Sequence, residues 1–201
     1  MRDWWLRTLL VLQHPRAVFV ALREDSKEAA AERAEPILLI VWLAGIAAVL
    51  ADAATYLNDP TRDRVDLLLW VFIGGGISGG FAYFVLGWIL HRVVRAFGSQ
   101  GTFRRSRHVL AFASVPIALS LVLWPVKLAL YGEDWFRTGG RDSGAGGVAL
   151  NLLGAGFVVW SIALLAVGVR SVHGWSWQRA LAATTIALAL PVAASAVLAV
   201  Y

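Results

Sequence analysis

The sequence contains no cysteine, which excludes disulfides, thiol catalysis and cysteine-bound metal sites. Charged residues are also scarce, at 15% of 201 residues, whereas apolar residues make up 59%. A soluble domain of this length has too little interior to hide so much apolar surface. We therefore expect lipid, rather than protein interior, to surround most of the apolar side chains.

Motifs for catalysis are missing as well. The sequence has no nucleophile–base arrangement, no paired carboxylates and no phosphate-binding glycine loop outside an apolar block. Its four histidines lie on separate segments, so their spacing predicts no metal site. We expect no enzymatic activity, cofactor or metal. The net charge of +5 does not indicate nucleic-acid binding, because the arginines lie between apolar blocks, where anionic lipid headgroups are the nearer partner.

The apolar residues that are present come in five long blocks. Each is close to or above the roughly 20 residues that a helix needs to cross about 30 Å of hydrocarbon. The sequence thus predicts an all-α membrane protein with two regions, a helical segment over residues 1–35 and a transmembrane domain over residues 36–201. The predicted spans cover about residues 36–57, 65–90, 109–131, 148–169 and 178–200.

Residues 1–35 show helical periodicity. Several apolar residues fall on one arc of a helix, namely Trp5, Leu6, Leu9, Leu10 and Leu12. This pattern predicts a helix that lies in the membrane interface, and a partner-docking helix is the alternative. Asp25 and Glu28 have the spacing of a capping box, which predicts a short polar helix leading to Pro36.

Lys and Arg are distributed unequally between the two sides of the predicted spans. Residues 1–35 and the loops after the second and fourth spans together contain thirteen. The opposite side contains four, and Lys127 is set aside because it lies within a span. Since cytoplasmic loops carry the excess of Lys and Arg, we expect a multi-pass protein of the cytoplasmic membrane. Its N-terminus is then cytoplasmic and its C-terminus lies outside.

Two charged residues, Asp52 and Lys127, lie at matching depths near the outer ends of the first and third spans. An unpaired charge at the centre of a span costs about 2.5 to 3.5 kcal/mol on insertion scales, and less near its end. We therefore expect an intramembrane ion pair between Asp52 and Lys127. The alternatives are separate snorkelling to the outer headgroups and, less favoured, a proton or ion relay.

Glycines and prolines mark the second, third and fifth spans. The second span holds two overlapping small-residue pairs, Gly75 with Gly79 and Gly76 with Gly80, which predict close helix packing. A loosened helix that lines a cavity is the alternative. Prolines at 116 and 125 in the third span, and at 191 in the fifth, predict kinks because each removes a backbone N–H. We expect fixed kinks at Pro116, Pro125 and Pro191 rather than hinges.

The loop from His91 to His108 is the densest positive feature of the sequence. Its five arginines are predicted to contact anionic lipid headgroups, and they are Arg92, Arg95, Arg104, Arg105 and Arg107. A specific lipid-head or protein-partner site is the sharper alternative. In the opposite loop, Trp135 and Phe136 are expected to dip into the outer interface.

Two stretches of the chain resemble the YIP family (Ypt/Rab-interacting proteins), in its bacterial branch. One is His14-Pro15-Arg16-Ala17-Val18-Phe19, ahead of the first span. The other runs from Gly98-Ser99-Gln100-Gly101-Thr102-Phe103-Arg104-Arg105 to Ala111-Phe112-Ala113-Ser114-Val115-Pro116. The resemblance implies five membrane helices and a non-enzymatic membrane role. Eukaryotic members act with Rab GTPases and carry an Asp-Leu-Tyr-Gly-Pro motif, which this sequence lacks, so Rab binding is not implied.

These observations together favour a structural or interaction protein that organises lipids or partner proteins at the cytoplasmic membrane. Membrane lipids are the expected partners, and a homo-oligomer or a membrane protein partner is left open. A small transporter or channel for ions, lipid or a small solute is the alternative function. A cavity between the second and third spans that reaches mid-membrane would favour transport.

Overall fold

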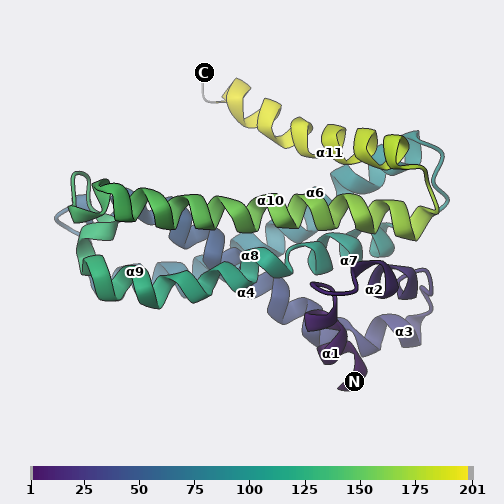
Figure 1. The fold of residues 1–201 in the computed structure, drawn as a ribbon, viewed down its shortest axis with the longest axis horizontal. Coiled ribbons are helices and arrows are strands. Elements are labelled where there is room, and N and C mark those ends of the chain that lie inside the picture. Colours follow the sequence, from purple (N-terminus) through teal and green to yellow (C-terminus); the bar gives the residue numbers. More distant parts are fainter. Residues whose placement is uncertain (1, 199–201) are drawn as a thin grey trace.

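The computed structural model describes the backbone of residues 2–198 and the side chains of residues 3–193, and this part of the chain contains no strand. Its longer helices form an elongated bundle (Figure 1). The α-helices are α1 (Arg2–Leu10), α2 (Pro15–Ala21), α3 (Lys27–Glu32), α4 (Ala34–Asp52), α5 (Arg64–Leu69), α6 (Gly75–Ala96), α7 (Phe103–Ala113), α8 (Val115–Leu119), α9 (Leu123–Tyr131), α10 (Ala145–His173) and α11 (Trp177–Leu198). The 3-10 and π segments are η1 (Ala53–Asn58), η2 (Trp70–Gly74), η3 (Ser120–Val122), η4 (Gly132–Phe136) and η5 (Arg141–Ser143).

Four uninterrupted or nearly uninterrupted helical stretches are long and apolar enough to cross a membrane. They are Ala34–Asn58, Arg64–Ala96, Phe103–Phe136 and Ala145–His173. They confirm the first four predicted spans as apolar helices, and the chain has the character of a membrane protein. The predicted fifth span corresponds to α11, although its last two residues lie outside the described part of the chain. That α11 crosses the membrane stays a prediction.

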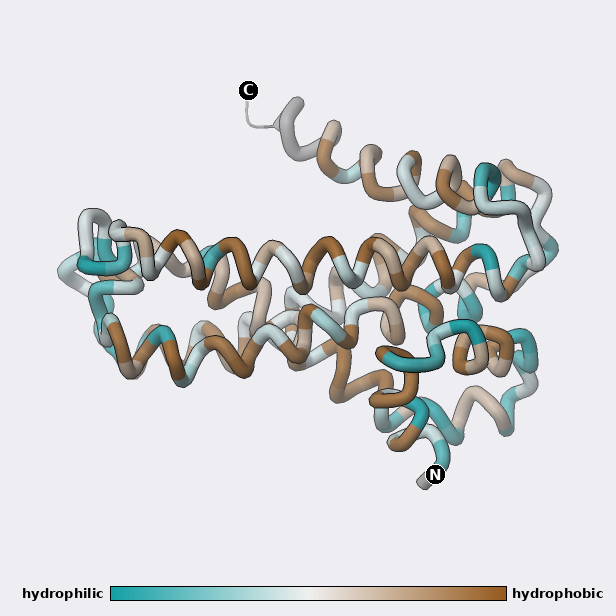
Figure 2. The backbone as a smooth tube through the Cα atoms, in the orientation of Figure 1, coloured by the Kyte–Doolittle hydropathy of each residue, from teal (hydrophilic) through white to brown (hydrophobic). Residues whose placement is uncertain are grey.

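The bundle has two polar ends. We call the basic end the one formed by α1 to α3, residues 97–102 and the helix ends that adjoin them, and the far end the one formed by residues 53–63 and 132–144 with their adjoining helix ends. Hydrophobic residues predominate in the long helices between these ends, and hydrophilic residues are concentrated at the ends themselves (Figure 2). Large apolar side chains also face outward from the spans, among them Leu38 and Phe81, at 72% and 69% exposure. Such exposure suits a hydrocarbon surrounding.

The N-terminal segment is folded against the basic end rather than trailing from it. Pro15 begins α2, a position that suits proline because the first N–H of a helix has no partner. Ser26 caps α3, since its Oγ accepts a hydrogen bond from the N–H of Ala29 at 3.1 Å. The predicted capping box of Asp25 and Glu28 is therefore wrong by one residue. A serine hydroxyl fills the cap, and the Asp25 carboxylate is used elsewhere.

The third span is irregular near both of its prolines. The helix is interrupted at Ser114, two residues before Pro116, where the Ser114 hydroxyl donates to the carbonyl of Ala111 at 2.8 Å. The 3-10 turn η3 then precedes Pro125. In contrast, α11 continues through Pro191. It leaves the basic end beside α10 and diverges from that helix toward its own C-terminus (Figure 1).

Candidate functional site at the basic end

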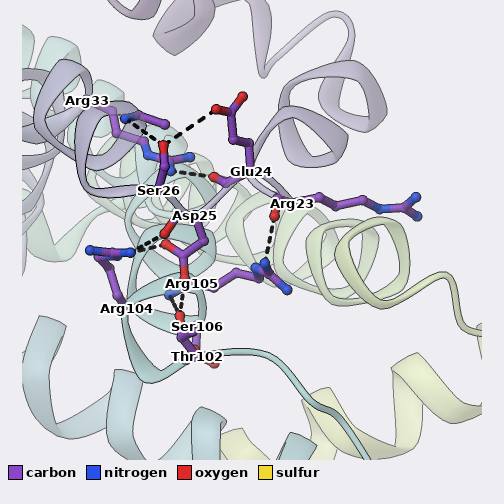
Figure 3. Close-up of polar contacts among 10 residues, drawn as sticks. Arg23, Glu24, Asp25, Ser26, Arg33, Thr102, Arg104, Arg105 and Ser106 are labelled. Carbon is purple, nitrogen blue, oxygen red and sulfur yellow. Dashed lines mark hydrogen bonds and ion pairs between the residues drawn. The ribbon is translucent and has the colours of Figure 1, made fainter.

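Asp25 joins the N-terminal segment to the start of α7. Its Oδ1 accepts a hydrogen bond from Nε of Arg104 at 2.7 Å, and its other carboxylate oxygen accepts from the Thr102 hydroxyl (Figure 3). Arg104 also donates to the backbone carbonyl of Asp25. Thr102 is the N-cap of α7, where its hydroxyl accepts from the N–H of Arg105 at 3.1 Å. One acidic side chain therefore holds both the cap and the first turn of this helix.

The electrostatics of Asp25 follow from these contacts. Burial alone would raise the pKa of the Asp25 carboxyl. The hydrogen bonds from Thr102 and Arg104, with the charges of Arg104 and Arg105, outweigh burial and lower its pKa below the usual value. Asp25 is therefore ionised at neutral pH.

Further arginines tie the same segment to its neighbours through backbone carbonyls. Arg105 Nη2 donates to the carbonyl of Arg23 at 2.6 Å (Figure 3). Arg23 Nη2 in turn donates to the carbonyl of Ser171 on α10, also at 2.6 Å. The N-terminal segment is thus bonded to α7 on one side and to α10 on the other.

Arg33, which precedes α4, is completely buried at this junction. Its Nη2 donates to the carbonyl of Glu24 at 2.6 Å, and its guanidinium lies 5.2 Å from the ring centroid of Trp4. Its Nε and Nη1 have no hydrogen-bond partner among the described residues. Burial lowers the pKa of Arg33, and the nearby Asp25 carboxylate opposes this effect. An arginine remains charged under such a shift, so the ionised Asp25 also balances a buried cation.

The loop between the second and third spans is held in place as well. Ser99 Oγ lies 3.1 Å from Nδ1 of His173, at the end of α10, and accepts from the N–H of Gly101 at 2.9 Å. On the other side of the loop, Arg179 of α11 donates to the carbonyl of Phe97. The turn is therefore part of the folded basic end.

The five arginines predicted to contact headgroups fall into separate groups. Arg104 and Arg105 bond to the N-terminal segment, and both are half-buried. Arg107 is also half-buried and lies over aromatic rings. Only Arg92 and Arg95 are exposed, and with His91 they line a surface hollow of about 460 Å³. The prediction of a uniform headgroup-binding loop thus divides into two arginines that face outward and three that pack against the protein.

At the far end, the structure does not bring Asp52 and Lys127 together. Among the described residues no ion pair joins them, and Asp52 is exposed. Lys127 is buried, and its Nζ lies 4.6 Å and 4.1 Å from the ring centroids of Trp124 and Trp135. Aromatic faces attract the ammonium here in place of the expected carboxylate. Trp135 and Phe136 belong to this buried cluster, so the expectation that they enter the outer interface is wrong.

The glycine run of the second span packs against α4. A Cβ on Gly79 would overlap the carbonyl oxygen of Val41, and a Cβ on Gly75 would overlap the backbone of Ile46. On the facing helix, Gly45 is equally tight against Gly75 and Gly79. A Cβ on Gly76 would be close to the Trp42 side chain, whereas a Cβ on Gly80 would meet none of the residues that the structure describes. The structure therefore brings α4 and α6 into backbone contact along one of the two predicted glycine pairs.

Beside this contact, an apolar groove of about 340 Å³ lies between the second and third spans. Its walls come from α4, α6 and the α7–α8 junction, and include Gly45, Ala82, Leu86, Leu110 and Ser114. The sequence alone predicted packing glycines in this region but no specific lining.

A family model provides the remaining comparison. The Yip1 domain model matches residues 9–199, which is nearly the whole chain. The chain belongs to the Yip1 domain family. No curated protein and no solved structure matches it. The resemblance to the YIP family expected from the sequence is thus confirmed, and the bacterial branch stays a prediction.

The stretches that carry the Yip1 resemblance contribute to one core at the basic end. Phe19 is completely buried, and its ring packs close to Gly168 of α10. Phe112 is likewise fully buried, and its ring lies 5.6 Å from that of Trp4. In this chain these family stretches therefore place the N-terminal segment on the bundle.

Sequence reasoning missed the polar part of the same junction. The sequence pattern predicts a helix cap at Asp25 and only a positive charge of the N-terminal segment at Arg33. The usable signal was the predicted location of Asp25 on the same side of the membrane as the arginine-rich loop, where opposite charges can pair.

Proposed function

We propose that this Yip1 family protein organises anionic lipid at the cytoplasmic face of a cell membrane without catalysing a reaction. The observation that carries the proposal is the division of the arginines at the basic end. Arg104 and Arg105 are bonded within the protein, whereas Arg92 and Arg95 remain exposed beside a hollow. Each basic residue near an anionic membrane surface contributes about 1 kcal/mol of attraction.

Apolar residues at the basic end support the same proposal. The Arg92 guanidinium lies 5.8 Å from the ring centroid of Trp88, a ring that is 55% exposed. On α1, Leu6 and Leu9 are more than 60% exposed, although the opposite side of this helix buries Trp4. Exposed tryptophan and leucine beside arginine are typical of residues at the membrane–water interface. The N-terminal segment would thus lie against the headgroups while it stays bonded to the bundle.

The proposal is tested by extracting the protein directly from its own membrane in polymer nanodiscs and measuring the enclosed lipids. We expect anionic lipid to be enriched over the bulk membrane, and the double variant Arg92→Gln, Arg95→Gln to lose much of that enrichment. The control is Arg62→Gln, Arg141→Gln, which removes the same charge at the far end. Wild-type discs with the composition of the bulk membrane would contradict lipid organisation, and a partner protein retained in them would favour the partner alternative.

A small transporter is the second candidate, and the groove between the second and third spans favours it. The groove walls are nearly all apolar, so they suit a lipid chain or an apolar solute better than an ion. Reconstituted protein that speeds the exchange of labelled lipid between bilayer leaflets would support transport. Leaflet exchange at the rate of protein-free vesicles would count against it.

A further inference from the structure

Arg107 lies beside the apolar groove, on the side of the basic end and next to the lining residue Tyr83. It is on the first two turns of α7, and Leu110, Ala111 and Ser114 follow it at helical spacing along the groove wall. Tyr83 links the two features, because it lines the groove and its ring centroid lies 5.1 Å from the Arg107 guanidinium carbon. The cation therefore sits where an occupant of the groove would place its polar end.

Among the described residues, the Arg107 side chain has no acidic partner. Its guanidinium carbon lies 4.5 Å and 4.6 Å from the ring centroids of Phe84 and Phe103. Its Nε is buried without a hydrogen-bond partner in the part of the chain that the structure describes, and no ion pair there includes it. Aromatic rings hold the cation in position but leave its Nε without a hydrogen bond to the described residues. An arginine fork of this kind matches the oxygens of a phosphate.

The dimensions of the groove fit one lipid chain. Its volume of about 340 Å³ lies at the small end of the range for ligand pockets, about 300 to 1,000 Å³. From Arg107 to Ile117, the last groove residue on this wall, α7 and the start of α8 together rise about 15 Å at roughly 1.5 Å per residue. That length is half of the approximately 30 Å hydrocarbon thickness, so it matches one leaflet.

We propose that this groove binds a single phospholipid of the cytoplasmic leaflet, with one acyl chain between α6 and α7 and the phosphate on Arg107. A partner helix would need an anionic side chain at the same depth, whereas a phospholipid brings its phosphate to the interface in any case. An anionic headgroup is preferred because it carries no ammonium group to repel Arg107. The proposal rests on the proposed function and assigns it a specific site.

The test is native mass spectrometry of the full chain in detergent, titrated with dioleoyl phosphatidylglycerol or dioleoyl phosphatidylcholine. The wild-type protein is expected to bind one phosphatidylglycerol molecule more tightly than all later ones, and more tightly than phosphatidylcholine. Arg107→Gln should weaken that first binding step about tenfold or more, because it removes the charge-assisted hydrogen bonds to the phosphate. Arg107→Lys keeps the charge but loses the planar fork of donors. Its affinity in the first binding step should lie between those of the wild-type protein and Arg107→Gln.

Two further variants separate a lipid site from a loss of folding. Ala82→Phe fills the groove with Arg107 intact, so it should also abolish the tight step. Arg62→Gln removes an exposed arginine at the far end, away from the groove, and should leave that step unchanged. Unchanged first binding in both Arg107→Gln and Ala82→Phe would overturn the groove site, while anionic enrichment in nanodiscs would still support the proposed function. A second copy of the chain occupying the groove, detected as a dimer that Ala82→Phe dissociates, would also overturn it.

Discussion

At the scale of single residues, Asp25 makes several polar contacts at the basic end. Its carboxylate pairs with Arg104, accepts a hydrogen bond from the Thr102 hydroxyl that caps α7, and lies near the buried charge of Arg33. Its side chain is 6% exposed and that of Arg104 is 33% exposed, so water screens their ion pair only in part. We assign the pair about 1.5 kcal/mol, the low end for hydrogen bonds to charged groups, because Arg104 remains partly solvated. This contribution favours the docked position of the N-terminal segment.

The docking is predicted to depend on pH. The docked state lowers the pKa of Asp25 below its ordinary value of 3.8, so the stabilisation is fully present above that value. It declines as the pH falls below about 4 and is lost once the pH passes the lower pKa of the docked state. Spin labels on Glu28→Cys and Gln100→Cys, in a chain without native cysteine, should therefore report a narrow distance distribution at pH 7 that broadens in acid.

Asp25→Asn is the matching variant for this experiment. It should broaden the distribution already at pH 7 and remove the dependence on Asp25 ionisation. A distribution in Asp25→Asn as narrow as in the parent protein would mean that this carboxylate does not hold the segment.

At the scale of elements, the contact between α4 and α6 depends on glycines that differ in what surrounds them. Gly79 touches the α4 backbone, whereas an added Cβ on Gly80, the next residue, would have no described neighbour within 4 Å. The two positions share a helix, a depth and a residue type. They therefore form a matched pair for measuring close packing.

Alanine at these positions is predicted to have opposite effects. Gly79→Ala should destabilise the protein by about 1 to 3 kcal/mol, because the methyl group forces α4 and α6 apart. Gly80→Ala should be neutral or stabilising by up to about 1 kcal/mol, since alanine favours the helix and meets no neighbour. Thermal unfolding of both variants in one detergent measures the difference. Equal melting temperatures would show that the backbone contact contributes nothing to stability.

These elements also indicate what could be read from the sequence. Apolar length predicts four of the long helices. Proline predicts the irregular turns, which lie within about one helical turn of Pro116 and Pro125. Both signals can be read from the sequence because each acts on its own segment. Which helices touch is not a local property. Nothing in the sequence around Gly79 identifies Gly45 as its neighbour, and matching depth suggested Asp52 as the partner of Lys127, where the fold supplies Trp124 and Trp135.

At the scale of the whole molecule, the proposals share one assumption, that the basic end faces the cytoplasm. The fold agrees with the uneven distribution of Lys and Arg, because it brings the Lys- and Arg-rich regions to one end. The N-terminal segment, the loop after the second span and the start of α11 all meet at this end (Figure 1). Thirteen of the eighteen Lys and Arg residues belong to the regions predicted to lie on that side. In this orientation the cytoplasmic leaflet is the one next to the docked segment, the exposed arginines and the lipid groove.

Cysteine labelling in cells tests this orientation most directly, because the chain has no native cysteine. Gln100→Cys at the basic end and Thr138→Cys at the far end are both exposed positions for a membrane-impermeant maleimide. We expect Thr138→Cys to react in intact cells, and Gln100→Cys to react only after the membrane is permeabilised. Labelling of Gln100→Cys in intact cells, with Thr138→Cys protected, would place the basic end outside and contradict the proposed function together with the cytoplasmic-leaflet site.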